Sequence, residues 1–271
     1  SVYKAQAQVS GFTCVGPPDL VLSQNGTLSI MGGTVCSPTT LNFLGINTTS
    51  PTHLVDIFGG DYNTISTLNN TGYMIGGQYV LWHNGVISTI MVGVGAGSPT
   101  TGVNNVYLGY NAGAGSTSFN NVILGSNAVG GGGIGADNVC IGYRAGFTAG
   151  PLAQYCVLIG ESAGQVNQAA GETFVGYQAG FFNTTPADFN TYLGDQAGYT
   201  NVGGGNNVCV GYRSGFLNTS NANAFFGTNS GSANATGSSN TFIGQSTGLS
   251  NNSGSNNVAL GAGANVTNNG T

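Results

Sequence analysis

Charged residues are scarce in this chain. Lys and Arg together number three and Asp and Glu eight among 271 residues, so 4% of the sequence is charged, against about 25% in an ordinary soluble domain. Nucleic-acid binding requires a basic footprint, whereas the formal net charge here is −5. We therefore expect no nucleic-acid partner, and we expect Asn, Ser, Thr and Gln to keep the protein in solution.

Long apolar runs are missing as well. No stretch of about 18 apolar residues occurs, so the sequence encodes no transmembrane helix and predicts no membrane insertion. The chain begins at Ser1 without an initiator Met or a signal peptide, and it ends in the repeat pattern at Thr271. These ends are typical of a processed or truncated product.

The residues that build most catalytic and metal sites are few. His53 and His83 are the only histidines, and neither lies in a recognisable nucleophile motif, so we assign no catalytic residue and expect no enzyme activity. The five cysteines lack metal-ligand spacing, so we expect neither a metal nor another cofactor. Cys14 and Cys36 lie in a segment with no other obvious core, and they are the one pair for which we consider an intrachain disulfide.

Glycine, in contrast, is abundant, with 49 residues, and it marks a repeat. A three-residue, largely apolar phrase followed by glycine recurs eleven times between Thr89 and Asn265, at intervals of 16 to 18 residues. These repeat glycines are Gly93, Gly109, Gly125, Gly142, Gly160, Gly176, Gly194, Gly211, Gly227, Gly244 and Gly261. Three apolar residues are too few for a helix and fit a buried strand. The sequence therefore predicts an all-β fold, a parallel β-solenoid or β-roll of about eleven coils of 16–18 residues.

Two further columns accompany the repeat glycine. The residue four positions before it is Asn in eight copies, namely Asn105, Asn121, Asn138, Asn190, Asn207, Asn223, Asn240 and Asn257. We expect these amides to form a hydrogen-bonded ladder along an edge of the solenoid. The residue three positions after the glycine is Ala, Ser or Thr in every copy, which predicts that the chain crosses close to its stacked neighbours there.

The chain before the repeats has a different pattern. Residues 1–88 alternate short apolar runs with Gly, Pro and Ser, and we expect a β-rich attachment or capping segment ahead of the solenoid domain, residues 89–271. Within it, Gly45-Ile-Asn-Thr-Thr-Ser-Pro51 and His53-Leu-Val-Asp-Ile-Phe-Gly59 resemble the segment that precedes repeats in many tail-fibre proteins.

The repeats themselves resemble the glycine-rich repeats of phage and virus tail-fibre or spike proteins, and they are similar to the heads of trimeric autotransporter adhesins. The resemblance implies a structural component on the surface of a virion, outside the cell, that projects or mediates host attachment. Its partners would be other virion or fibre proteins and a host surface glycan or receptor. Two alternatives stay open, a bacterial adhesin head and a tailspike that depolymerises glycans, for which Glu161 and Asp195 would supply the carboxylate pair.

One pair of motifs is a candidate ligand site. Tyr143-Arg144 and Tyr212-Arg213 occupy the same slot, directly after a repeat glycine. A tyrosine beside an arginine on a polar face can bind an acidic sugar by stacking and by a charge-assisted hydrogen bond.

The middle residue of the apolar phrase predicts the assembly. None of the eleven middle residues is charged, and we expect the outer two residues of each phrase to face the coil interior and the middle one to point outward. An apolar stripe along the whole rod would drive association, and the resemblance to trimeric fibres makes the expected assembly a homotrimer. The residues that we expect at this interface are Tyr107, Phe174, Tyr192, Phe225 and Phe242.

Overall fold

The computed structural model describes residues 44–46, 55–57, 71–75, 78–83, 89–99, 102–184 and 189–266. The chain divides into two compact units, Ser1–Thr64 and Ile65–Thr271. In the first unit, strands β1 (Leu44–Ile46) and β2 (Val55–Ile57) pair in parallel. The disulfide considered between Cys14 and Cys36 lies outside the described residues.

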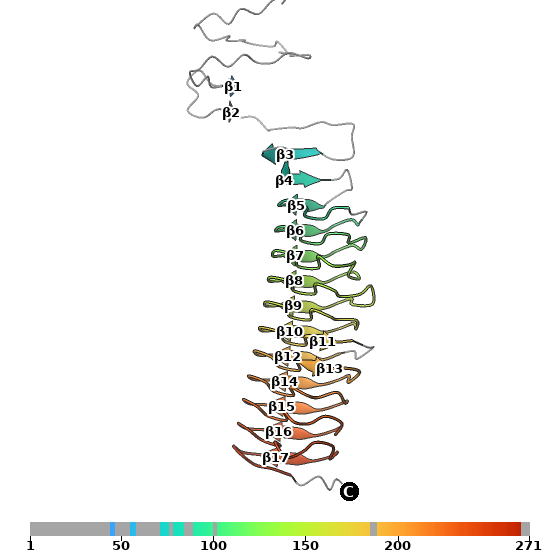
Figure 1. Ribbon diagram of the computed structural model, residues 1–271, viewed down its shortest axis with the longest axis vertical. Coiled ribbons are helices and arrows are strands. Elements are labelled where there is room, and N and C mark those ends of the chain that lie inside the picture. The colour runs from blue at the N-terminus through green and yellow to red at the C-terminus, as the bar shows by residue number, and fades with distance from the viewer. Residues whose placement is uncertain are drawn as a thin grey trace, which may run out of the picture. The chain divides into compact units, whose positions relative to one another are not determined.

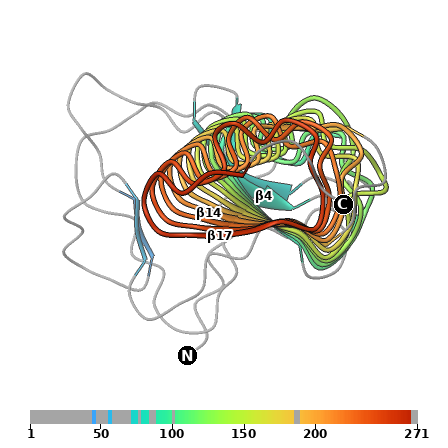
Figure 2. The same cartoon turned by 90° about the horizontal axis from the view of Figure 1, so that it is seen from below.

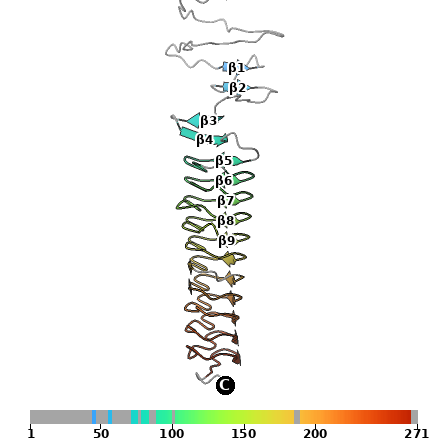
Figure 3. The same cartoon turned by 90° about the vertical axis from the view of Figure 1, so that its right-hand side faces the viewer.

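Eleven strands of three residues each stack in parallel in the second unit, as Figures 1 and 3 show. They are β5 (Ile90–Val92), β6 (Val106–Leu108), β7 (Val122–Leu124), β8 (Val139–Ile141), β9 (Val157–Ile159), β10 (Thr173–Val175), β12 (Thr191–Leu193), β14 (Val208–Val210), β15 (Ala224–Phe226), β16 (Thr241–Ile243) and β17 (Val258–Leu260). Equivalent positions pair from coil to coil, so that Tyr107 lies opposite Ile123 and Phe174 opposite Tyr192. The predicted parallel β-solenoid is confirmed, and none of the described residues is helical.

A hairpin precedes the first coil. Strands β3 (Thr71–Ile75) and β4 (Gln78–His83) are antiparallel, and β4 pairs antiparallel with β5, so the same sheet contains both hairpin strands and all eleven coil strands. The hairpin strands and the coils thus belong to the same compact unit, Ile65–Thr271. The domain boundary expected after residue 88 stays a prediction. A second, small parallel sheet joins β11 (Phe182–Asn183) to β13 (Thr200–Asn201).

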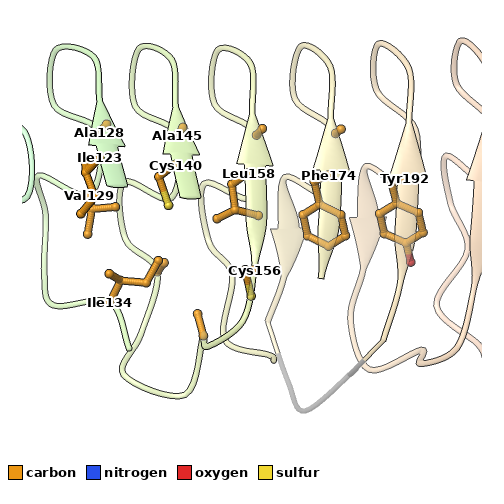
Figure 4. Close-up of a cluster of buried hydrophobic side chains, with 14 of the residues drawn as sticks. Ile123, Ala128, Val129, Ile134, Cys140, Ala145, Cys156, Leu158, Phe174 and Tyr192 are labelled. Carbon is orange, nitrogen blue, oxygen red and sulfur yellow. The ribbon is translucent and has the colours of Figure 1, made fainter. Parts of the chain in front are cut away.

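The middle residue of each strand fills the interior of the solenoid. All eleven middle residues are buried within the single chain, namely Met91, Tyr107, Ile123, Cys140, Leu158, Phe174, Tyr192, Cys209, Phe225, Phe242 and Ala259. Figure 4 shows that the labelled middle residues, such as Ile123, Phe174 and Tyr192, point into the coils, and Figure 2 shows the strands along one side of the coils. The two outer residues of each strand therefore face outward, which reverses the predicted direction of the strand faces.

This reversal corrects the predicted subunit interface. Tyr107, Phe174, Tyr192, Phe225 and Phe242 have no exposed surface in one chain, so they form its core and are not available to a partner chain. The expectation that these five side chains form an interface is wrong.

A second glycine in the coil explains how large rings fit inside it. Four residues after the repeat glycine, Gly180 packs against the ring of Phe174, and a Cβ atom added to Gly180 would lie 2.4 Å from that ring. Gly198 lies against Tyr192 in the same way. The rings also stack between coils, with 4.8 Å between the centroids of Phe174 and Tyr192. The aromatic middle residues are thus accommodated by the missing side chain across the coil.

The repeat glycine itself is required by close stacking. Gly109 has a φ of +134°, and a Cβ atom there would lie 2.7 Å from the backbone carbonyl carbon of Gly125 in the next coil. The small column predicted after each glycine is buried in every coil except the last, where Ala264 is partly buried, and Ala112, Ala145 and Ser214 illustrate it.

The predicted amide ladder is confirmed, and it lies inside the coils. The side-chain oxygen of Asn207 accepts a hydrogen bond from the backbone N–H of Asn223 at 2.9 Å, and that of Asn223 accepts one from Asn240 at 2.9 Å. Each amide thus pairs with the backbone of the next coil, which satisfies polar groups that burial would otherwise leave costly.

A second amide ladder went unrecognised in the sequence. Seven residues after the repeat glycine, six consecutive coils carry buried asparagines, namely Asn167, Asn183, Asn201, Asn218, Asn234 and Asn251. The Asn183 side chain donates to the Asn167 oxygen at 2.7 Å, and the Asn201 side chain donates to the Asn183 oxygen at 2.8 Å. The later coils therefore have two internal ladders where the earlier ones have one.

Candidate functional site

The residue that follows each repeat glycine forms a surface column. Its central members, which we call the tyrosine column, are Tyr110, Ser126, Tyr143, Glu161, Tyr177, Asp195 and Tyr212. Tyrosine occupies every second position of this series, with a smaller polar residue between.

Backbone hydrogen bonds hold the tyrosine column in register. Each of its carbonyl groups accepts a hydrogen bond from the coil below, for example Tyr143 from the N–H of Ser162 at 2.9 Å and Tyr177 from that of Gln196 at 2.8 Å. Because this ladder repeats at each coil, successive tyrosines are two coils, or roughly 10 Å, apart. Their side chains are 43–55% exposed.

Both predicted arginines stack on phenylalanine. Arg144 and Arg213 have φ values of +55° and +51°, so each backbone turns sharply directly after its tyrosine. The guanidinium carbon of Arg144 lies 4.3 Å from the centroid of Phe147, and that of Arg213 lies 4.1 Å from Phe216. Each arginine thus has an aromatic partner in its own coil.

The two acids considered for glycan cleavage lie in the tyrosine column. Glu161 and Asp195 are both exposed, with Tyr177 in the coil between them. The backbone N–H of Gln178 bonds the Glu161 carbonyl, and the N–H of Arg213 bonds the Asp195 carbonyl, each at 2.9 Å. The acids therefore flank an exposed aromatic ring on the surface of the solenoid.

A row of stacked rings follows five residues after the repeat glycine. The centroids of Phe181 and Tyr199 are 5.2 Å apart, and those of Tyr199 and Phe216 are 5.0 Å apart, with interplanar angles of 21° and 7°. Each ring covers the face of the next, so this row holds neighbouring coils together and presents mainly ring edges to solvent.

The thiols of the described cysteines are buried, and they are poor nucleophiles. Cys140, Cys156 and Cys209 are free. Burial raises the pKa of the Cys140 and Cys209 thiols far above the usual range, and burial raises that of Cys156 to about 11. Because the thiolate is the nucleophile, these cysteines act as small core residues.

The first amide ladder, four residues before the repeat glycine, also contains a carboxylate. Glu172 is fully buried in the position that asparagine occupies elsewhere, and its carboxylate accepts a hydrogen bond from the Asn190 N–H at 2.9 Å. It therefore takes the acceptor role of an asparagine in the ladder.

The described part of the chain shows neither a cluster of metal ligands nor a membrane-spanning helix. Its residues contain no group of three or more His, Cys, Asp or Glu side chains placed to hold a metal ion. None of its elements is a helix long and apolar enough to span a membrane. The side chains of His53 and His83 lie outside the described set. No protein-family model, curated protein or solved structure matches the chain.

Sequence reasoning found half of the tyrosines in the surface column. It selected Tyr143 and Tyr212 because each precedes an arginine, and it passed over Tyr110 and Tyr177, which precede Asn111 and Gln178. All four tyrosines can be identified by comparing the residue directly after the repeat glycine in every second copy of the repeat.

Proposed function

We propose that this chain is a structural component of a fibre or spike on the surface of a virion, which projects or mediates host attachment as a homotrimer. The observation that carries the proposal is the outward face of the strands. A stack of similar coils that presents the same face in every coil is suited to lateral assembly along its whole length.

This outward strand face consists of the first and third residues of each strand. It is aliphatic or aromatic in most coils, and it includes exposed side chains such as Val106, Leu108, Leu193, Phe226 and Ile243. Thr173, Thr191 and Thr241 are its only hydroxyl-bearing members, and it contains no charged residue. Apolar patches of this extent mark interaction surfaces, and identical chains would cover the strip by placing their strand faces around a common axis.

The number of chains follows from the resemblance to trimeric fibres. An apolar strip requires only a partner, whereas three-fold symmetry closes three such strips around one axis. The same arrangement leaves the loops of every coil on the outside, where a receptor can be bound.

The test is the molar mass of the protein in solution, measured by light scattering at micromolar concentration. We expect a wild-type mass of three chains and elongated particles in electron micrographs. Phe226→Asp and Leu193→Asp place a carboxylate on the outward strand face and should give monomers with the β-rich circular dichroism of the wild type.

The matched control is Ser239→Asp. Ser239 is exposed and lies two residues before β16, with a φ of +58°. Asp137 occupies the equivalent position before β8 with a φ of +61°, so the fold accepts an aspartate there. This variant should keep the wild-type mass. A folded wild-type monomer would contradict the proposal, and so would a trimer that both strand-face variants retain.

A further inference from the structure

We propose that the tyrosine column binds an extended, uncharged, β-linked glycan that runs along the solenoid axis. This inference deepens the proposed attachment function by naming the ligand class and its site. It rests on that function for its biological meaning, although the binding itself can be measured independently.

The tyrosine column offers partly exposed aromatic rings to a ligand. Tyr110, Tyr143, Tyr177 and Tyr212 are half-exposed, and no aromatic ring among the described residues stacks on them. The apolar face of a pyranose packs on an aromatic ring, and the phenol hydroxyl serves as both donor and acceptor for sugar hydroxyls. The row of Phe181, Tyr199 and Phe216 lacks this property because its rings cover one another.

The spacing of the column selects the shape of the ligand. Neighbouring tyrosines are roughly 10 Å apart along a straight backbone ladder. A β-1,4-linked glycan is an extended ribbon in which every second sugar has the same orientation, so alternate sugars can meet successive tyrosines. A compact or helical glycan would reach only one ring.

The residues between the tyrosines supply hydrogen bonds. Ser126, Glu161 and Asp195 occupy the alternating positions, and the two acids are exposed. A serine hydroxyl donates and accepts, and a carboxylate accepts, so each position can bind a sugar hydroxyl. The column therefore alternates stacking surfaces with polar groups along one line.

The charges beside the column favour an uncharged ligand. The column carries the carboxylates of Glu161 and Asp195, and Arg144 and Arg213 are the only Lys or Arg residues in the solenoid. Both guanidinium groups are stacked on phenylalanine rings, at 4.3 and 4.1 Å. No excess positive charge is available for an acidic glycan, in contrast to the acidic sugar expected from the Tyr-Arg pairs.

Titration calorimetry tests the proposal with three probes of equal length. Chitohexaose and cellohexaose are uncharged β-1,4-linked chains, and hexagalacturonate is an anionic α-1,4-linked chain, which differs from them in both charge and linkage. We expect wild-type protein to bind at least one uncharged hexasaccharide and to bind the corresponding disaccharide at least tenfold more weakly. It should also bind hexagalacturonate more weakly than the uncharged hexasaccharide that it binds.

The informative variant is Tyr143→Ala combined with Tyr177→Ala. Loss of two adjacent stacking contacts should weaken binding of the uncharged hexasaccharide about tenfold or more. The matched control is Tyr155→Ala, which removes a tyrosine that is 66% exposed but lies two residues before β9, outside the column. Its affinity should equal that of the wild type, and circular dichroism should show all variants folded.

The outcomes separate this inference from the proposed fibre. Absence of binding to both uncharged hexasaccharides overturns the glycan site, as does equal affinity in the double variant or tighter binding of hexagalacturonate. None of these results changes the mass measured by light scattering. Conversely, a wild-type monomer contradicts the proposed trimeric fibre while leaving a measured glycan affinity intact.

Discussion

The inner and outer faces of the same strands follow different rules. Inside, the middle residue varies from Ala259 to Tyr192, although every one is buried. Outside, the two flanking residues are mostly Val, Leu, Ile or Thr throughout the stack. The middle side chains fill the interior of the coil together with other residues of the same and adjacent coils. The flanking side chains instead form a surface of similar residues along the stack.

Some coils compensate locally for the size of the middle residue. Where the middle residue is Ile123, the coil carries Val129 four residues after its repeat glycine, and both side chains are buried. Where the middle residue is Phe174, that position is Gly180, which leaves room for the ring. In these two coils a pair of positions sets the packing density, while the outer face has no such partner within the chain.

Adjacent phenylalanines in β15 give the sharpest test of this comparison. Phe225 is fully buried and Phe226 is 39% exposed. We expect Phe225→Ala to lower the free energy of unfolding by about 3–5 kcal/mol, because it leaves a cavity between coils and removes the stacking on Phe242, 5.2 Å away. Phe226→Ala should lower it by less than about 1 kcal/mol in the monomeric Leu193→Asp background.

Urea unfolding followed by circular dichroism measures both changes. The Leu193→Asp background removes the contribution of assembly, because stability otherwise depends on protein concentration. Equal losses for the two phenylalanines would contradict the assignment of opposite faces.

The glycine across the coil provides the next test. Gly180→Ala should destabilise the protein by about 2–4 kcal/mol, because its Cβ atom would lie 2.4 Å from the Phe174 ring and its φ is +59°. Gly115→Ala is the control, with a φ of +76° and nothing within 4 Å of the added atom, and it should show only the smaller backbone cost. Thermal unfolding compares them, and a similar loss in both would mean that the ring imposes no constraint.

The first amide ladder, four residues before the repeat glycine, predicts a somewhat smaller loss of stability. Asn207→Gly removes the acceptor for the Asn223 N–H and the donor to the Asn190 oxygen, and it should cost about 2–3 kcal/mol. Asn206→Gly makes the same change in an exposed neighbour whose φ of +59° glycine adopts freely, so stability should change by less than about 0.5 kcal/mol. The measurement compares the denaturant midpoints of the two variants. Equal midpoints would show that the ladder does not contribute to stability.

Much of the fold was predictable because it depends on spacing. The repeat glycine, the small column after it and the asparagine ladder all follow from a coil that stacks directly on the next one. The direction of the strand faces was not predictable from the strand alone, since three apolar residues in a row show no alternation. The deciding residue lies outside the strand, in the glycine that leaves space for an inner ring, such as Gly180 beside Phe174.

The surface column was only partly predictable for a similar reason. Tyr143 and Tyr212 were found from their arginine neighbours. Those arginines, however, stack on Phe147 and Phe216, because their backbone φ is positive, and the Tyr-Arg motif does not predict that conformation. The second amide ladder was missed because it begins only at Asn167, so the whole repeat has no common residue there. Columns confined to part of a solenoid are visible only when neighbouring coils are compared.

The smallest expected effect concerns thiols of the interior at alkaline pH. Burial raises the pKa of Cys156 from an ordinary value of 9.0 to about 11, and burial raises that of Cys209 still further. A group whose pKa is higher in the folded state ionises first in the unfolded chain. Its contribution to stability is therefore complete below pH 9 and is lost as the pH rises, in the case of Cys156 until about pH 11.

Each such thiol should reduce the free energy of unfolding by about 1 kcal/mol per pH unit above pH 9. The measurement compares urea midpoints at pH 8 and pH 10 for the wild type and for Cys209→Ala. The variant should begin less stable, because a buried sulfur is lost, but it should lose less stability between the two pH values. Burial is the main cause that raises the pKa of Tyr192, and it acts in both proteins, whereas the smaller contribution of Cys209 to that pKa is present only in the wild type. An identical pH dependence in the two proteins would show that the Cys209 thiol does not ionise on unfolding, which would place it outside the closed interior.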